Sequence, residues 1–372
     1  MTHCFWQRAQ SWVFCGAFFL SSHSYAAGAG NAVPIEQPST QHLSSAHSIE
    51  RQTAEPQSYR YSDAHVHVLD FFQQGQPLTK LLEVMNAAGV GNAMVSGAPL
   101  MKKWHENEPK RPRYYAGDDA ELYWYSATDA YVAEAVQKLP PADRRRLHPF
   151  LSGINPTDKN AVIHLEAMLK LYPNLWQGIG EILTRHDDLT MMTANEPPRA
   201  NSEAMYRIYR FAQQHDLPVM VHTNITSKRE RNPLYLEELK EALRAHPDVK
   251  FIWAHAGTSK TLERFQGKMD FVLPSLQKLL KDHDNVYVDL SWSVLKPYML
   301  DKTGQPEAAW LELINTYPTR FMLGSDVLGS FDNLGENLQE FEVFLEKLPA
   351  DTARKMAREN FLALLPSTAA NY

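Results

Sequence analysis

The chain has 372 residues, 44% of them hydrophobic, which is enough to bury a sizeable core. This length exceeds a typical single domain, although single α/β barrels with insertions reach it. Because 43 acidic residues outnumber 37 basic ones and the formal charge is −6, no overall basic field favours nucleic acid or an anionic membrane.

The N-terminal residues have the pattern of a signal peptide. Arg8 supplies a sparse positive charge, Ser11–Leu20 form a short apolar run, and Ser24 and Ala26 put small residues at the cleavage positions. We therefore expect residues 1–26 to be removed and the protein to be exported to the periplasm. The apolar run is too short to span a bilayer comfortably, so an uncleaved anchor or a buried helix is the weaker alternative.

Both cysteines, Cys4 and Cys15, lie in this N-terminal segment. A lipoprotein anchor at Cys15 has little support, because Phe14 stands where a small residue is expected. The mature chain would have no cysteine, and therefore no disulfide and no thiolate nucleophile or metal ligand. Residues 27–58 are rich in Ala, Ser, Gln and Pro, and we predict that they form a disordered linker.

Strand-like and helix-like runs alternate through the predicted folded domain, residues 59–372. Eight strands are predicted, over Tyr61–Val68, Val90–Ser96, Leu147–Ile154, Trp176–Ile182, Pro218–His222, Lys250–His255, Val286–Leu290 and Arg320–Gly324. The predicted helices are Leu78–Ala88, Ala120–Leu139, Ala161–Leu171, Ser202–His215, Leu234–Ala245, Phe271–Lys281, Glu307–Thr316, Asn333–Lys347 and Asp351–Leu365. Eight βα units in a row predict an α/β protein with a (β/α)8 TIM barrel. An open doubly wound sheet would need a Gly-rich phosphate loop after the first strand, and the sequence has none there.

Side chains that bind metals stand at the ends of several predicted strands. His65 and His67 are two residues apart on the first strand, so they point to the same face and can hold one divalent cation. Further candidates stand at or just after the ends of the fourth, fifth, sixth and eighth strands: Glu181, His222, His255 and Asp326. Because the active site of such a barrel collects at the carboxyl ends of its strands, this order predicts a metal site at one mouth.

Each of these residues also has a purely structural interpretation. A lone histidine at the end of a strand is more often a packed or hydrogen-bonded structural residue. A buried Glu181 needs a compensating charge, and Arg185 could supply it in place of a metal. Asp326 could be the N-cap of the next helix. The recurrence of such residues in consecutive strands favours the metal site.

The ordered set resembles the amidohydrolase superfamily of metal-dependent (β/α)8 barrels. It combines Asp63-Ala-His65-Val-His67 with the later Glu, His, His and Asp. Two further segments, Phe321–Asp326 and Ala357–Leu365, are similar to the amidohydrolase-2 family within it. The resemblance covers residues 59–365, nearly all of the mature chain.

The resemblance implies roles for the individual residues. His65 and His67 would be metal ligands, and His222 would be one as in binuclear and some mononuclear members. His255 would be a ligand or a group that polarises the substrate, and Asp326 both a ligand and the general base. Many superfamily members carry a carboxylated lysine on the fourth strand, where this chain has Glu181. Glu181 resembles the bridging glutamate of other branches, including TatD-type nucleases. The resemblance therefore allows a site with either one or two metal ions.

We expect a metal-dependent hydrolase that acts through metal-activated water on an amide, a lactone or another ester. Imidazole and carboxylate ligands suit Zn²⁺, Mn²⁺ or Fe²⁺, and Zn²⁺ is the ion expected here. The alternatives are a non-oxidative metal-dependent decarboxylase, a TatD-like nuclease and a non-catalytic binding protein. The negative charge argues against nucleic acid as a partner, and the sequence does not indicate an oligomeric state.

Substrate choice is expected to lie in the segments that overhang the predicted site. The segment from Ala98 to Tyr125 is long for a βα loop and mixes cations with aromatic rings, among them Arg113 and Tyr115. Arg185 and Trp292 follow the fourth and seventh strands and are further candidates. Cations beside aromatic rings suit a small carboxylated or aromatic substrate. The alternative is a solvated charged loop with its aromatic residues packed beneath it.

Overall fold

The computed structural model describes residues 60–103, 120–186, 188–194 and 196–367. The predicted signal peptide (1–26), the predicted linker (27–58) and the candidate residues Arg113 and Tyr115 lie outside these ranges, so these interpretations stay predictions.

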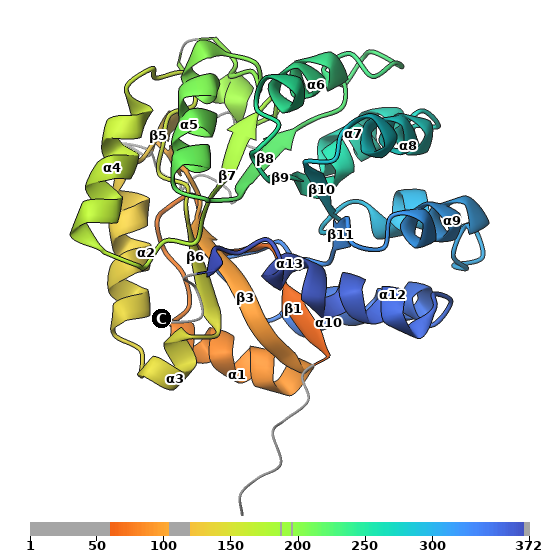
Figure 1. Cartoon of the computed structure of the whole chain (residues 1–372), viewed down its shortest axis with the longest axis horizontal. Helices are drawn as coiled ribbons and strands as arrows, with labels where there is room; N and C mark the ends of the chain where they lie inside the picture. The colour runs from red at the N-terminus through yellow and green to blue at the C-terminus, as the bar shows by residue number, and fades with distance from the viewer. Residues whose placement is uncertain (1–59, 104–119, 187, 195, 368–372) are drawn as a thin grey trace, which may run out of the picture. The chain divides into compact units, whose positions relative to one another are not determined.

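A ring of parallel strands forms the centre of the described domain (Figure 1). Their order along the sheet is β11-β10-β9-β8-β7-β6-β3-β2-β12, and β1 also pairs with β3. The strands are β1 (Tyr61–Asp63), β2 (Val66–Leu69), β3 (Val90–Gly97), β6 (Leu147–Leu151), β7 (Gly178–Thr184), β8 (Val219–Thr223), β9 (Phe251–Trp253), β10 (Val286–Asp289), β11 (Phe321–Met322) and β12 (Val327–Leu328). With β1 and β2 as one interrupted strand, and β11 and β12 as another, the ring has the eight positions of the predicted TIM barrel.

The first and last strands close this ring. β12 pairs in parallel with β2, Val327 lying opposite Val66. The backbone N–H of Ala64 donates to the carbonyl of Leu323 at 2.9 Å, which joins β1 to the end of β11. Each strand therefore has a neighbour on both sides, and no edge is left open.

Helices surround the ring on its outer side (Figure 1). They are α1 (Leu78–Ala88), α2 (Ala127–Gln137), α3 (Pro141–Arg144), α4 (Ala161–Leu171), α5 (Glu203–Gln214), α6 (Leu236–Ala245), α7 (Lys260–Gln266), α8 (Val272–Asp282), α9 (Ala308–Thr316), α10 (Leu334–Gln339), α11 (Glu342–Leu345) and α12 (Ala350–Arg354), whereas α13 (Asn360–Leu362) lies across one end of the ring. Helix α5 shows why they form: Ser202 Oγ accepts from Met205 N–H at 3.2 Å and caps the helix, and Ile208 buries on the face toward the sheet.

Several predicted elements differ in the structure, and two of these differences lie near the carboxyl ends of the strands. The helix predicted over Ala120–Leu139 begins only at Ala127, because β5 (Leu122–Trp124) pairs antiparallel with β4 (Leu100–Lys102). Aromatic residues suit a strand once a partner is present, and this long-range pairing overrides the local preference. The sixth strand ends at Trp253, two residues before His255, where the chain turns.

A small apolar cluster fills the inside of the ring. Its members are Ala64, Met94, Phe150, Met220, Ile252, Ala254, Met322, Phe361 and Leu364. Phe361 comes from α13, whose first residue, Asn360, donates to the carbonyl of Phe321 at 2.7 Å and to that of Pro318 at 2.9 Å. Because these carbonyls lie at and before the start of β11, α13 covers the amino ends of the strands. The carboxyl ends are left for a site.

Candidate metal centre

A glycine lets β7 carry Glu181 close to β8. Gly180 has φ +130°, and a Cβ at this position would lie 2.4 Å from the carbonyl oxygen of Met220. Only glycine fits such a close approach with this backbone conformation. The pairing register of β7 with β8 shifts between Ile179 and Ile182, at the point where Glu181 enters the ring.

Several residues just beyond the carboxyl ends of strands have left-handed backbone conformations. His255 (φ 55°), Trp292 (φ 58°) and Asp326 (φ 50°) follow β9, β10 and β11. Such conformations cost about 1–3 kcal/mol each in residues other than glycine and gather at functional sites. Beside His255, Gly257 (φ +71°) packs so tightly on Trp253 that a Cβ would lie 2.1 Å from its ring. These turns direct the side chains toward the mouth of the barrel.

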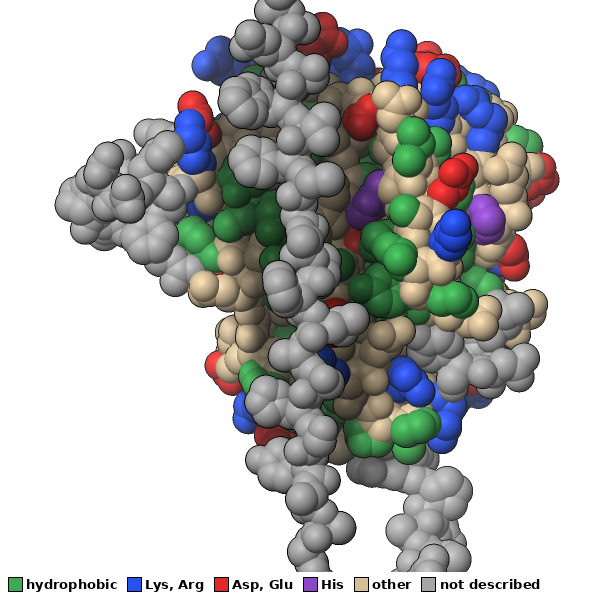
Figure 2. All heavy atoms as spheres, turned by 90° about the vertical axis from the view of Figure 1, so that its left-hand side faces the viewer, with side chains coloured by type: hydrophobic (Ala, Val, Ile, Leu, Met, Phe, Trp, Pro, Cys, Tyr) green, Lys and Arg blue, Asp and Glu red, His purple; other side chains and the backbone are tan. Residues whose placement is uncertain are grey.

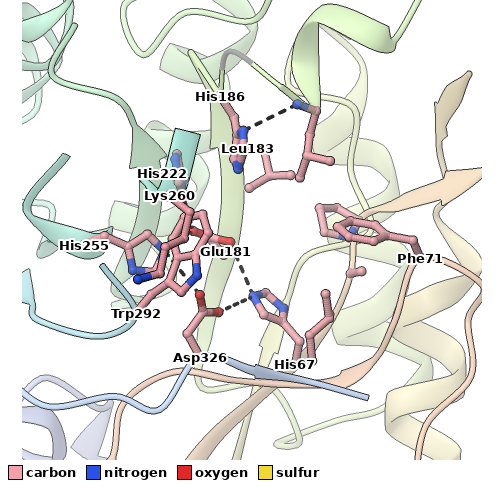
Figure 3. A pocket seen from close by; sticks show the side chains of 14 residues that line it. His67, Phe71, Glu181, Leu183, His186, His222, His255, Lys260, Trp292 and Asp326 are labelled. Carbon is pink, nitrogen blue, oxygen red and sulfur yellow. Dashed lines mark hydrogen bonds and ion pairs between the residues drawn. The ribbon is translucent and has the colours of Figure 1, made fainter. Parts of the chain in front are cut away.

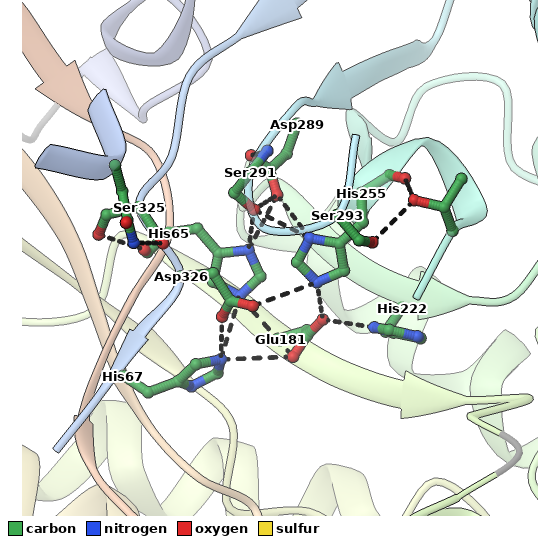
Figure 4. A network of polar contacts seen from close by, with 12 residues as sticks. His65, His67, Glu181, His222, His255, Asp289, Ser291, Ser293, Ser325 and Asp326 are labelled. Carbon is green, nitrogen blue, oxygen red and sulfur yellow. Dashed lines mark hydrogen bonds and ion pairs between the residues drawn. The ribbon is translucent and has the colours of Figure 1, made fainter. Parts of the chain in front are cut away.

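Four side chains converge on one point at this mouth (Figure 4). His65 Nε2 lies 3.1 Å from His67 Nε2, 3.7 Å from Glu181 Oε2 and 3.5 Å from Asp326 Oδ1. His67 Nε2 lies 3.4 Å from Glu181 Oε2 and 3.5 Å from Asp326 Oδ1. Ligands about 2.0–2.2 Å from a tetrahedral ion lie roughly 3.3–3.6 Å apart, and these separations of 3.1–3.7 Å are close to those around one Zn²⁺-sized cation.

A second set of ligand atoms adjoins the first and shares Glu181. His222 Nδ1 lies 2.9 Å and His255 Nε2 3.4 Å from Glu181 Oε1. His222 Nε2 lies 3.0 Å from Asn224 Oδ1, which accepts its N–H and leaves the Nδ1 lone pair directed at the centre. The two carboxylate oxygens of Glu181 thus face two groups of imidazoles, and the arrangement can hold one or two ions.

Asp289 on β10 holds the imidazoles from behind, and the sequence analysis missed it. Its Oδ2 lies 2.9 Å from His65 Nδ1 and 3.6 Å from His255 Nδ1, and Ser291 Oγ donates to it at 2.6 Å. His255 Nδ1 also lies 2.9 Å from Ser291 Oγ. Since these oxygens accept the Nδ1 protons, both Nε2 lone pairs point to the centre. The available signal was Asp289 at the end of a predicted strand, like the other ligands.

The charges of the cluster favour a cation. Burial lowers the pKa of His65, but the nearby carboxylates of Asp326, Glu181 and Asp289 outweigh it and raise the pKa well above the ordinary value. Burial alone would raise the pKa of Glu181, yet His65 and the adjacent imidazoles of His222 and His255 hold it well below the usual range. Three buried or half-buried carboxylates thus stabilise positive charge at this point, and a divalent cation on the imidazole lone pairs provides it.

Asp63, the first residue of the motif Asp63-Ala-His65-Val-His67, has another role. Its Oδ1 accepts the N–H of His65 at 3.1 Å and that of Ser325 at 2.9 Å, which ties β1 to the segment before Asp326. Its Oδ2 is buried and has no hydrogen-bond partner in the part of the chain that the structure describes. Burial raises the pKa of Asp63 to about 7, against the opposing hydrogen bonds.

A cavity of about 230 Å³ opens above the cluster (Figure 3). Its floor is formed by His67, Glu181, His222, His255 and Asp326. One wall is apolar and contains Phe71, Ala98, Pro99, Leu183, Leu189 and Leu328. Lys260 and Trp292 lie on the other side, across from Phe71 (Figure 3).

The cavity also contains two residues that the sequence analysis did not select, His186 and Lys260. The ring of His186 stacks on that of His222 with centroids 4.4 Å apart, and burial followed by the charge of His222 holds its pKa well below the ordinary value. Lys260 begins α7, five residues after His255. Neither stands at the end of a predicted strand, and the ends of strands were the positions at which the sequence predicted site residues.

The two remaining substrate-binding candidates are placed differently. Trp292 lines the cavity, with its ring centroid 5.2 Å from that of His255. The guanidinium of Arg185 pairs with the carboxylate of Glu238, with Nε at 2.8 Å from Oε2, and lies 4.4 Å from the ring centroid of Tyr235. Arg185 is not among the described residues that line the cavity, and its role in substrate binding stays a prediction.

Figure 2 shows the side of the molecule that lies at the left of Figure 1. This side includes α2 and α4, and hydrophobic side chains lie exposed there among cations and anions. Ile163 and Leu171 on α4 are 62% and 64% exposed. No helix within the described residues is both long and apolar enough to cross a membrane.

A closed parallel barrel with imidazoles and carboxylates gathered at the carboxyl ends of its strands defines the class of metal-dependent TIM-barrel enzymes. The sequence profile of one family in this class, the amidohydrolases, matches residues 62–366. The chain therefore belongs to the amidohydrolase family and is an enzyme of the metal-dependent hydrolase type. No curated protein matches the sequence.

Solved structures share the fold at low sequence identity. An uncharacterized TIM-barrel protein from Bordetella bronchiseptica is 16% identical, with a TM-score of 0.51, over 83% of this chain and 99% of that one. A probable 2-pyrone-4,6-dicarboxylic acid hydrolase from Acinetobacter baumannii is 12% identical, with a TM-score of 0.52, over 82% and 98%. A 2,6-dihydroxybenzoate decarboxylase is 13% identical, with a TM-score of 0.51, over 82% and 98%.

Proposed function

We propose that this protein hydrolyses an amide, a lactone or another ester of a small carboxylated or aromatic compound. One observation carries the proposal: the Nε2 atoms of His65 and His67 lie 3.4–3.7 Å from carboxylate oxygens of Glu181 and Asp326, close to the ligand separations around a single cation, directly under a cavity. Zn²⁺ suits these nitrogen and oxygen ligands, with the set of His222, His255 and Glu181 available for a second ion. When bound, the metal supplies a Lewis acid and lowers the pKa of water toward neutrality.

The side chains of the chain itself then divide the remaining work. Asp326, whose side chain is 14% exposed, is the carboxylate of the cluster that meets the cavity most openly, so it accepts the proton of the attacking water and returns it to the leaving group. His255 Nε2 lies 3.8 Å from Asp326 Oδ2 and can orient a substrate oxygen beside it. Asp289 keeps His65 and His255 in the required tautomer.

Non-oxidative decarboxylation is the second candidate. One solved structure with this fold is a 2,6-dihydroxybenzoate decarboxylase, and another is a probable 2-pyrone-4,6-dicarboxylic acid hydrolase. The cation site and the apolar wall would also suit an aromatic acid. A proton donor above an aromatic ring and release of carbon dioxide would be required.

The deciding experiment combines elemental analysis with a substrate screen. Protein purified without chelator is expected to contain about one or two equivalents of a divalent metal and to hydrolyse members of a panel of lactones, amides and esters. Hydroxybenzoates in the same panel, with carbon dioxide measured, test the second candidate. Protein without bound metal, which neither takes up Zn²⁺ nor turns over any compound, would overturn the proposal in favour of a binding protein.

Export is proposed separately, from the charged, apolar and small-residue pattern of residues 1–26. N-terminal sequencing of protein from the periplasmic fraction is expected to begin after Ala26. A retained Met1 would contradict cleavage.

A further inference from the structure

The walls of the cavity differ in chemical character. Phe71, Leu183 and Leu189 are each about 3% exposed and belong to one small apolar cluster with Ala98, Leu100 and Leu122. This cluster is packed from the end of β7, from β4 and β5, and from the segments that follow β2, β3 and β7, separately from the core inside the ring. A substrate is therefore offered a preformed apolar surface on one side, which suits a ring or an aliphatic body.

A single cation stands on the opposite side. Among the described residues that line the cavity, Lys260 is the one lysine or arginine. Figure 3 shows it beside His255 and Trp292, across the cavity from Phe71. The carboxylates on the floor are already matched by the imidazoles and, when it is bound, by the metal, so the charge of Lys260 is available to a ligand.

The backbone that carries Lys260 is firmly attached to the site. Thr258 Oγ1 donates to the carbonyl of His255 at 2.8 Å and lies 3.0 Å from Ser293 Oγ in the loop after β10. Ser259 Oγ accepts from Leu262 N–H at 3.2 Å and caps α7. The backbone of Lys260 is therefore fixed relative to His255, while the side chain of Lys260 reaches the mouth of the cavity.

The present partner of Lys260 holds it only weakly. Its Nζ lies 3.2 Å from Glu263 Oε2, and the two side chains are 52% and 36% exposed. Such exposed surface pairs contribute little to stability, so exchange of Glu263 for another anion costs little. A ligand that fills the cavity would also exclude water from Lys260 and strengthen the new pair.

We propose that Lys260 selects substrates that carry a carboxylate, held across the cavity from an apolar or aromatic body that rests on the Phe71 wall. The inference rests on the proposed hydrolase function and narrows its substrates to small amphipathic carboxylates, with Lys260 as the residue that recognises the carboxylate and the scissile bond between the two ends. The volume of about 230 Å³, below the roughly 300–1,000 Å³ of pockets for drug-sized ligands, limits the substrate to a small molecule.

The test compares two probes of nearly equal shape, 3-phenylpropionate and its neutral amide, by calorimetry with metal-loaded protein. The natural chain is expected to bind the carboxylate about tenfold more tightly than the amide, as a charge-assisted hydrogen bond allows. K260M is expected to lose this preference and to bind the amide unchanged. E263Q, which removes the partner and keeps the cation, is expected to retain or increase the preference.

Two outcomes would overturn the inference. A carboxylate held by the metal cluster instead would bind K260M as tightly as the natural chain. Equal weakening of both probes in K260M would show a general loss of shape, which the melting temperature of the variant reports independently. Because the measurement needs no turnover, a protein that hydrolyses nothing can still show the Lys260 preference, and an active hydrolase can lack it.

Discussion

Two buried histidines at different places in the barrel show how neighbours decide what an imidazole does. His65 faces carboxylates at the carboxyl end of the strands, and they outweigh burial and raise its pKa. His148 on β6 packs against Phe361 of α13 and lies 2.7 Å from Gln177 Oε1 and 3.0 Å from Asn92 Oδ1. Burial lowers the pKa of His148 to about 4, with only the Gln177 hydrogen bond opposing it.

The comparison teaches that burial alone does not mark a functional histidine. Amides satisfy hydrogen bonds without charge, so His148 stays neutral and structural. Carboxylates gathered around lone pairs create a site that is stable only with added positive charge. The mouth of the barrel has that arrangement, and it also holds the left-handed residues His255, Trp292 and Asp326.

The largest expected effect concerns Asp326. If the mouth is catalytic, D326N should lower kcat/KM on any substrate found in the screen by about 10²–10⁴-fold, because the proton acceptor is lost. The metal content, measured by elemental analysis, shows whether the ion is retained. D332N, a change of the same kind at an exposed position, should leave activity unchanged. Full turnover of metal-loaded D326N would exclude Asp326 as the base.

Removal of the metal should destabilise the protein only by the loss of its contacts with the ligands at the mouth of the barrel. A ligand at about 1,000 times its Kd stabilises the folded state by roughly 4 kcal/mol, so chelation should lower the free energy of unfolding by about that amount. Denaturant unfolding with and without Zn²⁺ measures this. H148Q should keep the response, and H67N should lose it. An identical response in H67N would place the bound metal elsewhere.

His148 should make stability depend on pH. Its folded pKa of about 4 lies below the unfolded value of 6.5, so the unfolded chain binds the proton more readily. The contribution of His148 to the free energy of unfolding is fully present above pH 6.5. It falls by about 3 kcal/mol as the pH drops toward 4. Urea unfolding at pH 7.5 and 4.5 should show a smaller loss for H148Q than for the natural chain. H215Q, at an exposed position, should behave like the natural chain.

The smallest expected effect concerns the support behind the ligands. D289N keeps the shape of Asp289 but removes the charge that orients His65 Nδ1, and should weaken metal affinity by about 10–100-fold. Competition with a coloured chelator measures the affinity. D284N, at a fully exposed residue, is the matched control. An unchanged affinity in D289N would leave Asp289 with a packing role only.

The sequence by itself determined the barrel and most of its mouth. Apolar runs typical of buried strands alternate with amphipathic runs typical of helices, and this alternation specifies βα units. Parallel strands place all their carboxyl ends on one side of the barrel. Residues at those ends, such as His67, Glu181 and Asp326, could therefore be predicted to meet without any knowledge of distances. The family resemblance of the same motifs pointed to the same class of enzyme.

Only the tertiary structure decided what surrounds these residues. Asp289 and Lys260 acquire their places from turns and hydrogen bonds between segments far apart in the chain, such as that of Thr258 with Ser293. The strand β5 exists because β4 pairs with it, although its residues alone favoured a helix. Local pattern fixes which way a side chain points from its own element; which charges and walls it meets depends on the closure of the ring, and no local pattern encodes that.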